Sequence, residues 1–340
     1  MSSRIKAWGW RGAVKALAVA ASVGMFAVLV MGTVVTNTNS AQGCGRDWPL
    51  CRGRFIPEFA VATFIEFSHR AVTGVEGILI VALAVGALVY WRQRRELQVL
   101  VPLMLAFLVI QAVLGGLAVK YPETPAVLAA HFGISLIAFA SVLLVTAVVW
   151  EAGGADALRD RPLPRGFVWS TWGLIVFTYL VVYIGAYVRH KGISLACPDW
   201  PLCQGAVVPQ LAGATGFARG IVLLHRYSAA LLVAGTVALL LWARRLRRGR
   251  PDLYRGSLAA LILLGGQALA GAWVVASRLS LFSTLGHAAL VALYFGALSY
   301  LCLHTLPRPA AFRRALVRRA APAAPRPAVS APVAQVAERD

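Results

Sequence analysis

Four histidines within long apolar segments are the residues whose type and spacing best suit chemistry. His69 and His131 are 62 residues apart, and His225 and His287 are separated by the same interval. Each lies a few turns from the same end of its segment, so the members of a pair reach a similar depth. Two neutral imidazoles in an apolar slot suit the two axial positions of a haem iron. The spacing therefore predicts two haem-sized pockets, whereas a lone histidine of this kind is equally well explained by a hydrogen bond between helices.

A carboxylate accompanies only the first pair. Glu66 precedes His69 by three residues and shares its helix face, and the matching residue in the second half is Val222. Such a carboxylate can move protons or stabilise a developing positive charge. We predict that Glu66 is catalytic and that the second pocket passes electrons; the alternative is a solvated glutamate at the headgroup level. Glu76, with Leu232 as its counterpart, is either a proton relay or a neutralised carboxyl.

Two further polar pairs recur at matched positions. Arg70 and Arg226 directly follow a histidine and are candidate partners for haem propionates, or else they snorkel to the outer interface. Gln111 and Gln267 lie in the middle of their apolar segments, which favours hydrogen bonds between helices.

Two short loops carry cysteine pairs, Cys44 with Cys51 and Cys197 with Cys203. Loops this short close a disulfide when the α-carbons come within about 7 Å. For Cys197 and Cys203 we favour a structural staple. For Cys44 and Cys51 two alternatives remain open: a structural staple, and a redox switch or thiol relay. Cys302 lies in an apolar run and is expected to be a small buried hydrophobic residue.

The elements that must position these residues are membrane-spanning helices. The 340 residues are 59% hydrophobic and 14% charged, whereas soluble proteins are roughly 45–50% apolar and 25% charged. We therefore predict an all-α polytopic membrane protein. A span needs about 20 apolar residues. Eight runs qualify: 14–35, 63–90, 99–119, 125–149, 167–188, 218–243, 257–276 and 282–304.

The net charge of +20 comes largely from arginine clusters between these runs. With the N-terminus inside, 23 of the 33 lysine and arginine residues fall in inner segments. The positive-inside rule then places both termini in the cytoplasm and both cysteine loops outside, where disulfides persist. This distribution argues against a nucleic-acid partner. We expect His190, in an outer loop, and His304, at the inner end of the last span, to be solvated or interfacial.

The chain also repeats itself. Asp47-Trp-Pro-Leu-Cys51 recurs as Asp199-Trp-Pro-Leu-Cys203, and Gly115 recurs as Gly271. Because each unit contains an even number of spans, both units enter the membrane from the same side and the repeats are parallel. We predict two tandem parallel four-helix bundles and a disordered tail. The predicted boundaries are 1–150, 151–305 and 306–340.

These residues resemble the haem A synthase family over nearly the whole chain to about residue 305. The resemblance rests on the cysteine loop with its Asp-Trp-Pro-Leu-Cys motif, on Glu66-Phe-Ser-His-Arg70, on Gly185-Ala-Tyr-Val-Arg189 and on the four histidines. It implies an enzyme that oxidises the C8 methyl group of haem O to a formyl group by successive hydroxylations, giving haem A. The oxygen atom would come from water or O₂.

The resemblance also implies roles for individual residues. The implied roles are a haem b cofactor on His225 and His287, substrate haem on His69 and His131, an essential acid at Glu66, and a Cys44–Cys51 disulfide in substrate handling or electron input. A multi-pass protein of the bacterial cell membrane is expected. The implied partners are haem O, membrane lipid, an unidentified electron donor, haem O synthase, cytochrome oxidase assembly and a second copy of the chain.

Rival functions make different predictions. A bis-His dihaem electron-transfer cytochrome would yield no modified haem, and a glutamate in only one repeat argues against it. A quinone-linked thiol oxidoreductase without haem would need all four loop cysteines and would be colourless. A transporter with parallel repeats more often shows glycine or proline breaks at mid-span, and these spans are largely unbroken.

Overall fold

The computed structural model describes residues 2–121, 124–151 and 155–307. Over these residues the chain is helical, forms no β-strand and contains eight helices long and apolar enough to cross a membrane. This confirms the predicted all-α polytopic class. Residues 2–307 form one compact unit. The predicted disordered tail, 306–340, lies outside the described residues except for its first two positions.

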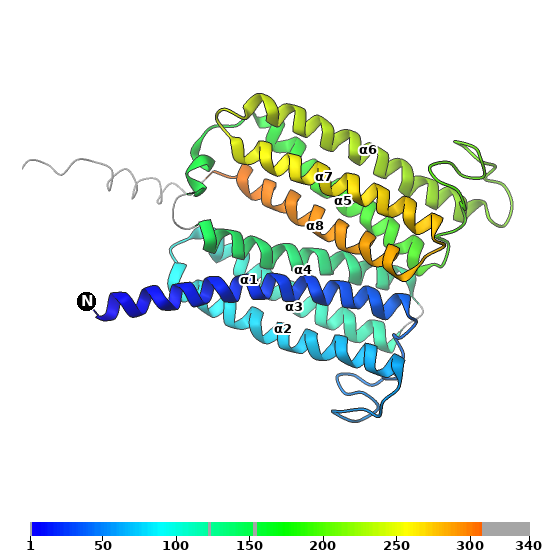
Figure 1. The fold of residues 1–340 in the computed structure, drawn as a ribbon, viewed down its shortest axis with the longest axis horizontal. Helices are drawn as coiled ribbons and strands as arrows, with labels where there is room; N and C mark the ends of the chain where they lie inside the picture. The colour runs from blue at the N-terminus through cyan, green and yellow to red at the C-terminus, as the bar shows by residue number, and fades with distance from the viewer. Residues whose placement is uncertain (1, 122–123, 152–154, 308–340) are drawn as a thin grey trace, which may run out of the picture. The chain divides into compact units, whose positions relative to one another are not determined.

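Each observed helix contains one predicted apolar run and extends beyond it at one or both ends (Figure 1). A short 3-10 helix that the sequence did not predict, η1 (Ala155–Asp160), precedes the fifth span. The spans are α1 (Ser2–Asn37), α2 (Val61–Trp91), α3 (Arg95–Lys120), α4 (Pro125–Glu151), α5 (Arg165–His190), α6 (Gly216–Leu246), α7 (Pro251–Ala276) and α8 (Leu281–Thr305).

Local signals explain several helix starts. α4 and α7 begin at Pro125 and Pro251, and proline suits the first helical position because its fixed φ is already helical. α8 begins after Ser280, whose hydroxyl accepts the Ser283 N–H at 3.4 Å as an N-cap.

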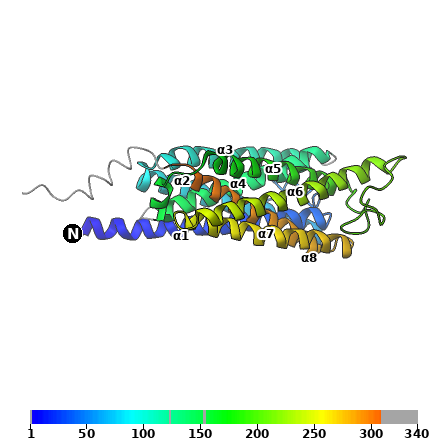
Figure 2. The ribbon, with the colours of Figure 1, turned by 90° about the horizontal axis from the view of Figure 1, so that it is seen from above.

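Helix packing is consistent with two groups, α1–α4 and α5–α8. Each helix packs against the next, α1 also packs against α4, and α5 also packs against α8. The groups meet through α4, α5, α8 and α1. The helix axes lie roughly parallel to one another, and successive helices alternate in chain direction (Figures 1 and 2). α4 and α8 are the most buried spans, because they lie at this seam. The division at residue 150 stays a prediction.

The seam between α4 and α8 is closely packed and mostly apolar. Phe139 on α4 and Phe295 on α8 belong to one buried cluster. Gly296 allows the helices to approach, because a Cβ at this position would lie 2.8 Å from Leu143 Cδ2 and 3.3 Å from Phe139 Cε1. A larger residue would therefore have to displace the end of the Leu143 side chain where the two groups touch.

A buried polar cluster joins the groups at the end opposite the cysteine loops. His304 Nδ1 lies 2.9 Å from Asp252, and His304 Nε2 lies 3.2 Å from Glu151, which also accepts the Tyr300 hydroxyl at 2.7 Å. Arg250 pairs with Asp252 at 2.7 Å. His304 is 1% exposed. The expectation that it is solvated was wrong, because α4 and α7 bring carboxylates to it from distant parts of the chain, and an interfacial depth stays a prediction.

Replacing Gly296 with leucine should destabilise the helical unit, because the added side chain must displace Leu143 and Phe139. Overpacking of this kind costs about 1–3 kcal/mol. We expect a lower midpoint of thermal unfolding in detergent, followed by circular dichroism. Gly265→Leu on α7 is the matched control, because nothing lies within 4 Å of a Cβ there. Equal midpoints for the two variants would contradict the close approach of α4 and α8.

Candidate functional site at the cysteine-loop end

All four candidate histidines lie near the end of the helical unit that carries the cysteine loops. His69, His131, His225 and His287 stand in the first three turns of α2, α4, α6 and α8, respectively. Within each predicted pair the rings are near enough for their charges to interact, His69 with His131 and His225 with His287. Both pairs that the spacing predicts therefore lie at the same end of the helical unit, and their role as metal ligands stays a prediction.

A glycine of the preceding helix faces each histidine ring. A Cβ at these glycines would lie 2.6–3.4 Å from the imidazole, so an added side chain would press on the ring at Gly185 and Gly271 and would touch it at Gly32 and Gly115. The four pairs are Gly32 with His69, Gly115 with His131, Gly185 with His225, and Gly271 with His287. The sequence showed Gly115 and Gly271 as repeated residues. It did not assign Gly32 and Gly185 to the site, although Gly185 begins the Gly-Ala-Tyr-Val-Arg segment.

The two glutamines make the predicted interhelical hydrogen bonds, and their partners are the histidines. Gln111 Nε2 lies 3.2 Å from His131 Nε2, and Gln267 Nε2 lies 3.1 Å from His287 Nε2. An amide nitrogen donates, so the imidazole accepts and is neutral. His225 differs, because its Nδ1 lies 3.2 Å from the Val181 carbonyl oxygen, which suits a donated N–H and leaves Nε2 as a free acceptor.

The histidine pairs fit a metal bound between two imidazoles. His69, His131 and His287 each have a buried Nδ1 without a hydrogen-bond partner in the described part of the chain. In neutral His131 and His287 this Nδ1 carries the proton, because Nε2 accepts from glutamine, so a metal would bind Nε2 in place of the glutamine N–H. Buried neutral imidazoles in apolar surroundings are suitable axial ligands for a haem iron. The residues that the structure describes include no group of three or more histidine, cysteine or acidic side chains able to hold a metal ion. Each pair would therefore supply two ligands and the macrocycle the rest.

Glu66 joins α2 to cysteine loop 1, which we define as residues 38–60. Its side chain accepts the Cys44 N–H at 2.7 Å and pairs with Arg70 at 2.5 Å. Arg70 also donates to the carbonyl oxygens of Asp47 and Leu50, at 2.7 and 2.8 Å. Glu66 is only 3% exposed. The interpretation of Glu66 as a solvated headgroup-level residue was therefore wrong, because the loop folds back over it.

The matching arginine holds cysteine loop 2, residues 191–215, without a carboxylate. Arg226 donates to the carbonyl oxygens of Leu202 and, at 2.9 Å, Cys197. The residue in the position of the glutamate is Val222, which is buried. In loop 1 the arginine thus forms an ion pair with a glutamate as well as hydrogen bonds to backbone carbonyls. In loop 2 the hydrogen bonds of the arginine go to backbone carbonyls.

Loop 2 has a carboxylate of its own at its exposed surface. Asp199 accepts the backbone N–H groups of Gln204 and Gly205, at 2.6 and 2.8 Å. The hydrogen bond from Gly205 is the main cause that holds the pKa of this carboxyl below its usual range. This carboxylate faces water and organises the turn, so it does not replace Glu66.

Both predicted disulfides are formed, Cys44 with Cys51 and Cys197 with Cys203, with α-carbons 4.5 and 4.7 Å apart. All four sulfurs belong to buried residues. Gly116 on α3 makes room for the Trp48 ring of loop 1, because a Cβ there would be 3.4 Å from the indole. The loop is therefore held against α2 and α3. The fifth cysteine, Cys302, is free and buried, as expected.

Two other polar groups extend the site. Glu76 is 3% exposed and packs against Gly24 of α1, and its Oε1 has no hydrogen-bond partner among the described residues. Arg189 donates twice to Asn37 Oδ1, at 3.1 and 2.7 Å, and so ties the end of α5 to the end of α1. His190 beside it is partly buried. Sequence reasoning missed Asn37, because no local pattern marks it.

Comparison with known proteins finds relatives that span most of the chain. A family model described as a cytochrome oxidase assembly protein, COX15-CtaA, matches residues 15–299 and 171–336. A protein of Symbiobacterium thermophilum is 40% identical over 301 residues, covering 87% of this chain and 96% of the relative. Proteins of Bacillus pumilus and Geobacillus kaustophilus are 41% and 38% identical, covering 86% and 92% of this chain and 94% and 97% of the relatives. All three relatives are named "Heme A synthase".

Replacing Glu66 with alanine should loosen cysteine loop 1, because the Cys44 N–H and the Arg70 guanidinium both lose their acceptor. A hydrogen bond to a charged group contributes about 1.5–3 kcal/mol, so amide exchange in the loop should rise roughly 10- to 100-fold. Hydrogen-exchange mass spectrometry measures this. The matched control is Val222→Ala, which should leave exchange in loop 2 unchanged. Unaltered exchange in the Glu66 variant would show that the carboxylate does not hold the loop.

Proposed function

Because this chain belongs to the COX15-CtaA family of cytochrome oxidase assembly proteins, we propose that it is a haem A synthase. In this function it is an oxidoreductase that converts haem O to haem A by oxidising the C8 methyl group to a formyl group. The names of the relatives support the activity. The observation that carries the proposal is a buried acid, Glu66, beside only one of two matched histidine pairs.

The two pairs take different haems in this proposal. His225 and His287 would hold haem b as the resident cofactor, which supplies one-electron transfer when bound. The hydrogen bond between His225 Nδ1 and Val181 supports this role, because it orients the ring and leaves Nε2 for iron. His69 and His131 would bind haem O as substrate. Arg70 and Arg226 remain candidate partners for propionates, although both already bind loop carbonyls.

The reaction replaces methyl C–H bonds by C–O bonds in two hydroxylations. The second gives a gem-diol, which loses water to form the aldehyde. With water as the oxygen source, protons and electrons leave the pocket, whereas with O₂ they enter it. Glu66 accepts or returns a proton beside the substrate, and its bonds to Cys44 and Arg70 hold the carboxylate in one orientation.

Loop 1 would act as the cover of the substrate pocket. Cys44 of its disulfide contacts Glu66, since the Cys44 amide donates to that carboxylate. This position suits a structural staple and also suits electron input through thiol–disulfide exchange. The second disulfide, Cys197–Cys203, lies in a loop without the glutamate and would be a staple.

The cellular setting completes the proposal. Arginine clusters at the ends opposite the cysteine loops favour an orientation with both termini in the cytoplasm, and the bacterial relatives favour the bacterial plasma membrane. Haem O synthase would supply the substrate, and cytochrome oxidase assembly would receive the product. The other expected partners are an electron donor and a second copy of the chain. A dihaem electron-transfer cytochrome is disfavoured, because it has no use for a buried acid in one half alone.

Glu66→Gln should lower haem A formation by at least about 100-fold, because the amide keeps an oxygen for the Cys44 N–H but cannot carry a proton. Haem extraction and chromatography from a host that makes haem O measures the product. Glu58→Gln is the control, since Glu58 is an exposed carboxylate paired with Arg54 on the same loop. Undiminished haem A in the Glu66 variant would remove this residue from the reaction.

Alanine at His225 or His287 should abolish the haem b that co-purifies with the chain, because one axial ligand is lost. Alanine at His69 or His131 should leave that haem in place and prevent haem O binding. Haem content per protein and the absorption spectrum of each purified variant measure the difference. The assignment is reversed if the His69 and His131 variants are the ones that lose the resident haem.

A further inference from the structure

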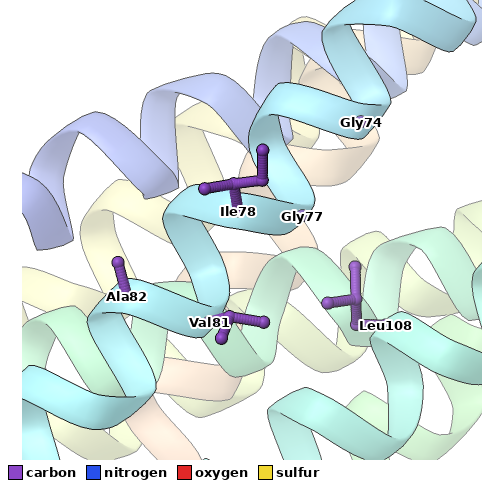
Figure 3. Close-up of a pocket in the computed structure, with 6 residues that line it drawn as sticks. All are labelled: Gly74, Gly77, Ile78, Val81, Ala82 and Leu108. Carbon is purple, nitrogen blue, oxygen red and sulfur yellow. The ribbon is translucent and has the colours of Figure 1, made fainter.

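An apolar groove of about 540 Å³ opens between α2 and α3. Figure 3 shows its two walls, with most of the lining on α2 and one leucine from α3. The lining contains no charged side chain. Its members are Gly74, Gly77, Ile78, Val81, Ala82 and Leu108.

The groove begins close to the first histidine pair and runs away from the cysteine loops. On α2 its lining starts five residues after His69 and ends at Ala82, about 7–20 Å further along the helix axis. On α3, Leu108 lies three residues, or about one turn, from Gln111. Gln111 is the hydrogen-bond partner of His131. α2 therefore carries both His69 and most of the groove lining, and α3 carries both Leu108 and the glutamine that contacts His131.

Two glycines open the groove, and they occur in only one repeat. Nothing lies within 4 Å of a Cβ built on Gly74 or Gly77. At the interval that relates His69 to His225, their counterparts are Ala230 and Val233. α6 also packs more extensively against α7 than α2 does against α3. The groove therefore belongs to the half that contains Glu66.

We propose that this groove binds the isoprenoid tail of the substrate haem, an inference that rests on the proposed function. Haem O carries a long farnesyl-type chain where haem b carries a vinyl group, so the two haems differ most in an apolar tail. A pocket that selects haem O needs an apolar groove that a haem b pocket does not need. The groove has the apolar composition, the position and the glycines of one repeat that this selection requires.

The difference between the repeats also distinguishes a haem tail from a membrane lipid as the occupant of the groove. An acyl chain of a lipid fills any apolar groove on a membrane protein, and it gains nothing from glycines placed in one repeat beside the histidine pair. A lipid as sole occupant is nevertheless an outcome that the experiment detects, because it gives no preference for haem O over haem b.

The test is a double variant, Gly74→Ala with Gly77→Val, which gives the groove the lining residues of the second repeat. Both added side chains enter open space, so the fold is expected to persist. Haem O and haem b are titrated separately into the purified protein that retains its resident haem, and binding at the first pair is followed by absorption. Gly173→Val on α5 is the matched control, because its Cβ position is equally open.

The wild-type protein should bind haem O at least about tenfold more tightly than haem b, since small changes in an apolar pocket alter affinity on that scale. The double variant should lose this preference through weaker haem O binding, while its affinity for haem b and its resident haem stay unchanged. Gly173→Val should keep the wild-type preference. Ala82→Leu, which fills the far end of the groove, should weaken haem O binding in the same direction.

An unchanged preference in the double variant would overturn the proposal, and so would a wild-type protein that binds the two haems equally. Failure of the proposed function looks different. In that case the wild type forms no haem A, or neither haem binds in a manner that depends on His131, whatever residues line the groove.

Discussion

A carboxylate buried within an apolar helical unit must find hydrogen-bond donors, and the site depends on how Glu66 does so. An unpaired charge at membrane depth is costly. Glu66 meets this requirement with the Cys44 amide and the Arg70 guanidinium. Because Arg70 also binds carbonyls of the same loop, loop 1 cannot lift without breaking the bonds that orient the acid. The same hydrogen bonds thus fix both the position of loop 1 and the orientation of the Glu66 carboxylate, which lies one helical turn from His69.

The two halves share a scaffold and differ where chemistry is proposed. In each half, glycines seat two histidine rings and an arginine binds the cysteine loop. The departures concentrate in the first half, where Glu66 replaces a valine and Gly74 and Gly77 replace larger residues. The duplicated scaffold explains how one chain can present two similar histidine pairs. The departures explain how one of them can have an acid on one side and an apolar groove nearby.

Hydrogen-bond satisfaction also accounts for most other buried polar groups. Gln111 and Gln267 bind histidines, and His304 lies between two carboxylates that α4 and α7 contribute. The cluster around His304 joins the two groups of helices at the end away from the site. The apolar seam of α4 and α8 joins them along their length. Glu76 is among the residues that have a buried side-chain atom without a hydrogen-bond partner in the described part of the chain, as are Gln111 and Gln267 at their amide oxygens.

The sequence by itself determined the eight spans, the pairing of histidines and the two disulfide loops, because hydropathy, spacing and repetition are local or periodic properties. Only the tertiary structure decided which residues surround those groups. Gly32 and Gly185 face histidines, yet the chain from Gly185 to His225 is three residues longer than from Gly32 to His69, which hides their equivalence. The burial of Glu66 depends on a loop that folds back over it. The surroundings of a side chain come from segments distant in sequence, and no local pattern records that packing.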